Sequence, residues 1–143
     1  MSKRIRTFED LECWQACRCL RQFVAHELVG VLPRDEKYRL TDQLLRAARS
    51  TTANIAGGYG RYHYLDNAKF CSNSRGSCCE ILDHLITAHD EGMISASLLE
   101  QGRNLVSESV RILNGYIRYL KSANDSAVHE DAPLYTRTDL NNQ

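Results

Sequence analysis

The chain has 143 residues, a length typical of one domain that buries a core without disulfides or metals. It contains no apolar run near the roughly 18 residues of a membrane-spanning helix, and its start, MSKRIRTFEDLE, lacks the apolar region of a secretory signal. We therefore expect a soluble cytoplasmic protein with no membrane partner.

Charge is balanced in total but uneven along the chain. The 18 Lys/Arg match the 18 Asp/Glu, yet residues 1–61 hold 11 Lys/Arg and 7 Asp/Glu, leaving 7 and 11 for residues 62–143. A basic half of this kind suits an anion, a nucleic acid or the acidic face of a second copy.

No segment shows the alternation of a strand, so the sequence predicts an all-helical chain. Thr7 is a plausible N-cap for a first helix that ends before Pro33. Its apolar stripe has spacings of three and four: Leu11, Trp14, Cys17, Leu20 or Arg21, Val24, Leu28 and Val31.

A second helix is expected after Pro33, with Asp35 and Glu36 in its first turn. Its apolar seam has 3-4-3-4 spacing: Leu45, Ala48, Thr52, Ile55 and Tyr59. Three glycines follow in NIAGGYGRYHY, and Gly57, Gly58 and Gly60 are interpreted as the end of this helix. They do not form a phosphate loop, because such a loop follows a strand.

A third helix should begin near Tyr64 or Asp66 and end before Gly92. A fourth should begin with Ser97 as N-cap and Glu100 completing a capping box, and should stop near Lys121. Short connections favour an up-down-up-down antiparallel four-helix bundle. We thus divide the chain into a basic N-terminal arm at 1–7, the bundle at 8–121, and a mobile polar tail at 122–143.

Metal, cofactor and catalytic sites are not favoured. No His lies three residues after a Glu, which excludes the paired Glu-x-x-His motif of di-iron bundles. The six cysteines lie in helical patterns without a CxxC, so we expect reduced core thiols and no zinc site. Glu80, Asp83 and His84 lie one turn apart, but such groups are common on solvated helices. We expect no cofactor and no enzymatic activity.

Basic residues are the better functional candidates. Arg39, Arg46 and Arg49 are spaced by seven and three, so we expect them on one helix face, where they would follow a phosphate backbone. A solvated face with local pairs such as Asp42 to Arg46 is the alternative. The full predicted nucleic-acid-binding set is Arg18, Arg21, Arg39, Arg46, Arg49, Arg61, Tyr62 and His63, the last two as groups that stack on bases. Packing between helices or subunits is the alternative for the aromatic groups near Arg61.

Four blocks of the sequence resemble a known family. They are FEDLECWQACRCL, YRLTDQLLRAARSTTANIAGGYGR, RGSCCEILDHLITAHDEGMIS and RILNGYIRYLK. In this order they resemble the four-helix-bundle proteins encoded in intervening sequences of 23S ribosomal RNA genes. Accessory variability proteins of diversity-generating retroelements are of the same kind. The second block is the most specific, although Gly57 stands where the family usually has Glu.

The resemblance implies a homo-oligomer, typically a pentamer, without known catalytic activity. In retroelements such proteins bind the template RNA and a reverse transcriptase. Our first hypothesis is therefore a non-enzymatic, oligomeric RNA-binding accessory protein. The alternative is an oligomeric protein-interaction scaffold whose opposite charges hold subunits together.

Overall fold

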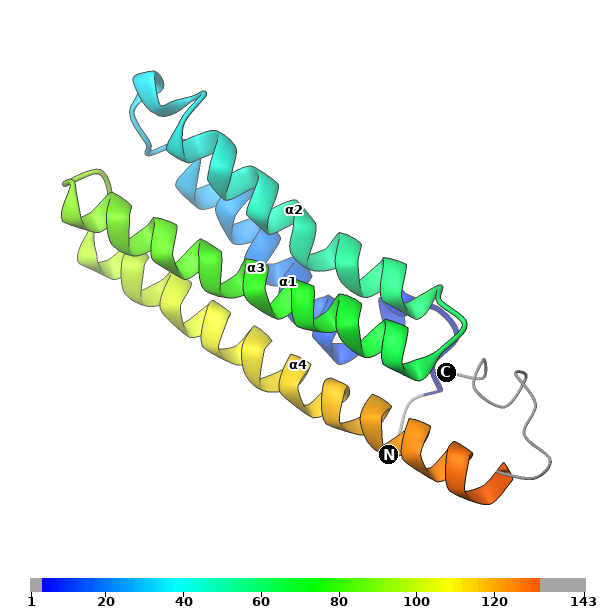
Figure 1. Ribbon diagram of the computed structural model, residues 1–143. Coiled ribbons are helices and arrows are strands. Elements are labelled where there is room, and N and C mark those ends of the chain that lie inside the picture. The colour runs from blue at the N-terminus through cyan, green and yellow to red at the C-terminus, as the bar shows by residue number, and fades with distance from the viewer. Residues whose placement is uncertain (1–3, 132–143) are drawn as a thin grey trace.

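Four helices pack around one core in the computed structural model of the protein, which describes the backbone of residues 4–131 and the side chains of residues 4–127 (Figure 1). They are α1 (Glu12–Phe23), α2 (Leu40–Tyr59), α3 (Tyr64–Asp90) and α4 (Ala96–Asp131). Each helix contacts the next along the chain, and α1 also contacts α4. This closed order confirms the predicted all-α four-helix bundle, and no strand occurs within residues 4–131.

The first helix is less regular than the spacing predicts. Thr7 does act as a cap, but its side chain accepts from the amide of Glu9 in a short 3-10 helix, Phe8–Asp10. Helix α1 begins later, at Glu12, after Leu11 takes an extended conformation. Its axis then continues through a π-helical segment, Val24–Leu28.

The second helix begins later than expected. Residues Arg34–Glu36 form a separate 3-10 turn after Pro33, and α2 starts at Leu40. The Glu36 carboxylate accepts from the Leu40 amide at 3.2 Å, so this acidic residue caps the helix from outside it. The buried face also differs from the predicted seam, because Leu44 and Thr51 are fully buried while Leu45 and Tyr59 are only half-buried.

Of the three glycines predicted to end α2, only Gly60 lies at its end. Gly57 and Gly58 lie inside the helix, and Gly60, its C-cap, has a right-handed φ of −78°. A Cβ atom on Gly58 would lie 2.6 Å from Asn67 Oδ1 and 2.8 Å from Phe70 Cβ on α3. Gly58 therefore permits close approach of α2 and α3, and the chain turns only after Tyr59.

Helix α3 follows the prediction more closely. It begins at Tyr64, and Gly92 just beyond its end has the left-handed φ of +75° expected of a terminating glycine.

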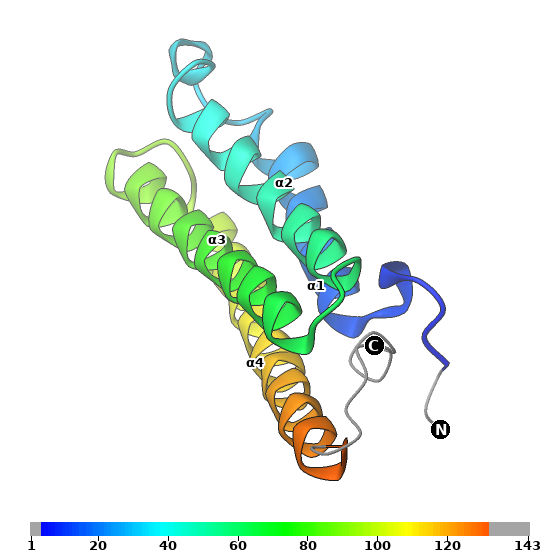
Figure 2. The ribbon, with the colours of Figure 1, turned by 45° about the vertical axis from the view of Figure 1, so that its right-hand side comes forward.

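Helix α4 begins and ends differently from the prediction. Its N-cap is Ser95, whose hydroxyl accepts from the Leu98 amide at 3.1 Å, and not Ser97, which is exposed. The helix also continues to Asp131, ten residues past Lys121, so part of the expected tail is helical. Its last turns extend beyond the other helices (Figure 2). The rest of that tail, residues 132–143, lies outside the described residues.

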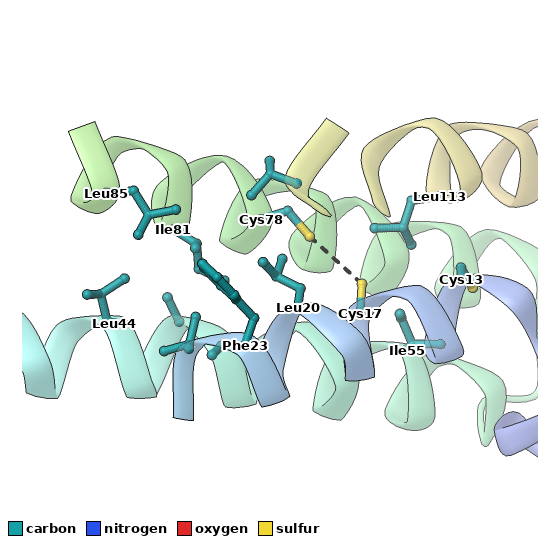
Figure 3. Close-up of a cluster of buried hydrophobic side chains, with 14 of the residues drawn as sticks. Cys13, Cys17, Leu20, Phe23, Leu44, Ile55, Cys78, Ile81, Leu85 and Leu113 are labelled. Atoms are coloured by element: carbon teal, nitrogen blue, oxygen red, sulfur yellow. Dashed lines mark hydrogen bonds between the residues drawn. The ribbon is translucent and has the colours of Figure 1, made fainter. Parts of the chain in front are cut away.

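A thiol and hydroxyl layer crosses the middle of the core. Cys17 Sγ of α1 lies 3.8 Å from Cys78 Sγ of α3, among aliphatic side chains (Figure 3). Ser74 lies 3.9 Å from Cys17 and donates to the Thr51 carbonyl at 2.8 Å. The hydrogen bond between the thiols lowers the pKa of Cys17 and raises that of Cys78. Cys13 and Cys71 are also buried, so these thiols pack as small core residues.

Candidate nucleic-acid interface

The uneven charge of the sequence becomes a difference between two sides of the bundle. Helices α1 and α2 lie next to each other and carry four arginines, while α3 alone carries four carboxylates against Lys69 and Arg75. The four arginines on α1 and α2 are Arg18, Arg21, Arg46 and Arg49. The only carboxylates on these two helices are Glu12 and Asp42. The α1–α2 side is therefore the more basic side.

A groove of about 320 Å³ between α1 and α2 brings two predicted residues together. Arg21 and Arg49 line it, and its other lining residues are Ala25, Leu45, Ala48 and Thr52. Arg21 donates to Thr52 Oγ1 at 2.8 Å, which fixes its guanidinium at the groove wall. The side chain of Arg49 is exposed and makes no hydrogen bond or ion pair within the described residues, while its backbone carbonyl accepts from Thr52 Oγ1 at 3.4 Å. No carboxylate lines this groove, so its two positive charges are available to an anion.

Arg39, Arg46 and Arg49 do not form the single stripe that their spacing suggested. Arg39 precedes α2 with a non-helical backbone, at φ −120° and ψ −106°. Arg46 borders a different groove, between α2 and α3, and lies 3.8 Å from Asp42. The Asp42–Arg46 pair, named above as part of the alternative interpretation, is thus present. Helical positions three apart differ by about 60° in direction, which is enough to turn Arg46 and Arg49 toward opposite neighbours.

The remaining predicted residues are held by aromatic contacts. The guanidinium of Arg18 lies 5.7 Å from the Trp14 ring centre, and that of Arg61 lies 4.6 Å from the Phe70 ring centre. Such cation–π contacts leave the guanidinium edge open to an anion.

The two predicted stacking residues differ in exposure: the Tyr62 side chain is exposed, and the His63 side chain is half-buried. Tyr62 is 62% exposed, and its ring centre lies 6.4 Å from that of His63. His63 is half-buried and precedes the first residue of α3, so Tyr62 is the better placed of the two to contact a base.

Sequence reasoning missed a second basic groove, between α3 and α4. Lys69, Arg75 and Lys121 line it, together with Ser72 and Asn73 and without a carboxylate. Arg75 donates to Asn114 Oδ1 at 2.6 Å and to Ser72 Oγ at 3.3 Å. Lys69 and Arg75 lie about two turns apart on one helix, but Lys121 joins them only through packing of α4.

A third groove, of about 550 Å³, is formed by the N-terminal segment, the start of α1, the end of α2 and one face of α4. The face of α4 around Gly115 forms one wall, with Ile112, Tyr116 and Tyr119 exposing apolar surface. Ile5, Leu11, Glu12 and Tyr59 form the rest of the wall, and Arg111 and Arg118 flank Gly115. Aromatic residues at i and i+3 on α4 were the available signal, but the helix was expected to end nearby.

The acid-base candidates do not form a larger cluster. His84 Nε2 lies 3.6 Å from Glu80 Oε2, and Asp83 is exposed on the surface of α3. Glu80 and His84 share the α2–α3 groove with Ser50 and Ser77, whose hydroxyls are 2.9 Å apart. Among the side chains of residues 4–127, no three His, Cys, Asp or Glu are grouped in a way that would hold a metal ion. None of the described helices is long and apolar enough to cross a membrane.

These features define a small helical-bundle protein whose surface grooves carry arginine, lysine and tyrosine. Residues 9–115 match the sequence model of the 23S rRNA-intervening sequence protein family, and the chain belongs to this family. The match covers the four helices up to Gly115, including the α1–α2 groove. No curated protein matches the chain in sequence.

Proposed function

We propose that this protein is a non-enzymatic RNA-binding protein that acts as a homo-oligomer in the cytoplasm. The observation that carries the proposal is the α1–α2 groove, which Arg21 and Arg49 line without a carboxylate. Positive charge of this kind binds the phosphate backbone with little dependence on base sequence. Membership of a family named for 23S rRNA intervening sequences supports RNA as the polyanion.

The more specific role is an accessory one. Following the resemblance to accessory variability proteins, we propose that the protein binds the template RNA and the reverse transcriptase of a retroelement, and that it assembles as a pentamer. Co-purification of the reverse transcriptase and light scattering of the purified chain test these two statements separately. Loss of the reverse transcriptase after nuclease treatment would indicate that RNA bridges the two proteins.

Arg49 offers the sharpest test of RNA binding. Its side chain is exposed and makes no polar contact within the described residues, so Arg49→Gln removes a charge without disturbing the bundle. The matched control is Arg103→Gln, which also removes one charge but from α4, where Arg103 lies 3.7 Å from Glu100. We expect the first variant alone to weaken RNA binding several-fold and to reduce the salt dependence by about one phosphate contact.

Fluorescence anisotropy with a structured RNA, at about 50 mM and about 200 mM salt, measures both quantities. Equal RNA affinity of the Arg49→Gln and Arg103→Gln variants would show that the α1–α2 groove does not contact RNA. An absence of salt-dependent binding by the unchanged protein would refute the RNA-binding function itself.

A protein-interaction scaffold is the second candidate, and the opposed charges of the α1–α2 side and of α3 favour it. The basic α1–α2 side of one copy is complementary to the carboxylates on α3 of another. In that case Arg49→Gln should lower the oligomer mass measured by light scattering at low salt. It should leave the mass unchanged if the groove serves RNA.

A further inference from the structure

The α4 groove around Gly115 has a chemical character that the α1–α2 groove lacks. Tyr116 and Tyr119 stack with their ring planes 13° apart and their centres 6.1 Å apart. Tyr119 is 55% exposed, so one face of this aromatic pair is open to solvent. A flat, exposed ring on a helix is a surface on which a nucleic-acid base stacks.

A hydrogen bond from the bundle core holds Tyr116, the less exposed ring of the pair, in place. The hydroxyl of Tyr116 accepts a hydrogen bond from Asn67 Nδ2 at 3.2 Å, and Asn67 is fully buried in α3. Tyr116 is thereby held in orientation while Tyr119 rests against its ring. A preorganised ring loses little conformational freedom when a ligand binds to it.

The charges next to the rings are complementary to a nucleotide. The guanidinium of Arg118 lies over Gly115, where an added Cβ atom would be 3.8 Å from its Nη2. Arg118 makes no ion pair within the described residues, whereas Arg111 is paired with Glu108 at 2.6 Å. Arg118 is therefore the available cation for a phosphate. Glu12 on the opposite wall repels phosphate and can accept from an exocyclic amino group of a base.

We propose that this groove binds an unpaired nucleotide of single-stranded RNA, with the base stacked on Tyr119 and its phosphate contacting Arg118. The proposal rests on the RNA-binding function. It adds a preference for unpaired RNA, which the basic α1–α2 and α3–α4 grooves do not supply. Phosphate contacts alone treat paired and unpaired RNA alike, but a stacking site requires an unpaired base.

The test compares two RNA probes with matched variants. One probe is fluorescein-labelled oligo(rA) of about 12 nucleotides, within the site sizes of about 4–16 nucleotides seen for stacking proteins, and the other is a mixed-sequence duplex of similar length. Tyr119→Ala removes the exposed ring, and Tyr119→Phe keeps it while removing a hydroxyl that makes no hydrogen bond in the described part of the chain. Because Tyr119 is largely exposed, both variants should fold, which circular dichroism verifies.

We expect Tyr119→Ala to weaken oligo(rA) binding about tenfold and to leave duplex binding within twofold of the unchanged protein. Tyr119→Phe should bind both probes normally. Arg118→Gln should weaken oligo(rA) binding several-fold and lower its salt dependence by about one phosphate.

Four outcomes would overturn the inference. If Tyr119→Ala binds oligo(rA) normally while the duplex still binds, the nucleotide site is refuted and the proposed function stands. If it weakens both probes equally, the ring has no preference for unpaired bases. If instead it changes only the oligomer mass, the groove is occupied by a second copy of the chain. Failure of the unchanged protein to bind either probe refutes the RNA-binding function as well.

Discussion

Replacing Gly58 by Ala should destabilise the protein, although Ala is the better helix former. A Cβ atom at this position would lie 2.6 Å from Asn67 Oδ1 and 3.1 Å from the Asn67 carbonyl oxygen. It would also lie 2.8 Å from Phe70 Cβ, which is not the flexible end of a side chain. Helices α2 and α3 must then separate by roughly 1 Å to restore normal contacts of about 3.5–4.0 Å.

Two opposing terms set the size of the effect. Overpacking of a well-packed interface costs about 1–3 kcal/mol, while exchange of a helical Gly for Ala contributes about 1 kcal/mol of stability. Displacement of Asn67 also weakens its hydrogen bond to Tyr116. We therefore expect Gly58→Ala to lower the free energy of unfolding by about 1–2 kcal/mol. For a chain of this size that corresponds to a fall in Tm of about 3–6 °C.

The neighbouring glycine is the matched control. Gly57 is exposed in the same helix, and its Cβ would meet the Phe70 ring at 3.5 Å, an ordinary contact. Gly57→Ala should therefore stabilise the protein by up to about 1 kcal/mol. Gly76→Ala on α3, with nothing within 4 Å, should do the same. Thermal unfolding followed by circular dichroism measures all three variants. A Gly58→Ala protein that melts with or above the Gly57→Ala protein would refute the close-approach argument.

Two further predictions concern the helix cap and the thiols. Ser95→Ala should lower the free energy of unfolding in urea by about 1 kcal/mol, because it removes the acceptor for the Leu98 amide. Ser97→Ala should have little effect, and equal losses for the two variants would contradict the assignment of Ser95 as the N-cap. At neutral pH, Ellman's reagent should modify the two exposed thiols, Cys19 and Cys79, and leave the four buried thiols unreacted until the protein unfolds. Fast modification of more than two thiols would show that the core opens readily.

The sequence predicted the helices better than their ends. Apolar spacing reports which residues are buried, so it located four helices and the short turns between them. It did not predict α4 beyond Lys121, because residues 122–127 bury no continuous apolar stripe. Backbone hydrogen bonds keep such turns helical, and these bonds do not require apolar residues at regular spacing.

The glycines illustrate a different limit. Local preference associates Gly with helix ends, and this rule holds at Gly92, where φ is positive. At Gly58 the reason for glycine is a contact with Asn67 and Phe70 of another helix. Nothing in residues 54–64 indicates which neighbour lies opposite.

The sequence predicted the positive charge of the candidate site, but it did not predict which basic residues lie together in one groove. The basic N-terminal half of the sequence forms a basic helix pair, on which Arg49 is exposed. The partners of each arginine come from other helices, so the pairing of Arg21 with Arg49 required the packed structure. The same holds for Lys69 and Lys121, which are distant in sequence and line one groove.

The packing of the bundle and the proposed nucleotide groove are linked through one side chain. Gly58 allows Asn67 to reach its buried position between α2 and α3, and Asn67 in turn donates to the Tyr116 hydroxyl. Because Tyr116 supports Tyr119, the orientation of the exposed ring depends on how closely two other helices approach. A glycine that first resembled a helix terminator thus contributes to the surface presented by α4. Its effect on RNA would be indirect, through the position of an aromatic ring rather than through any contact with phosphate.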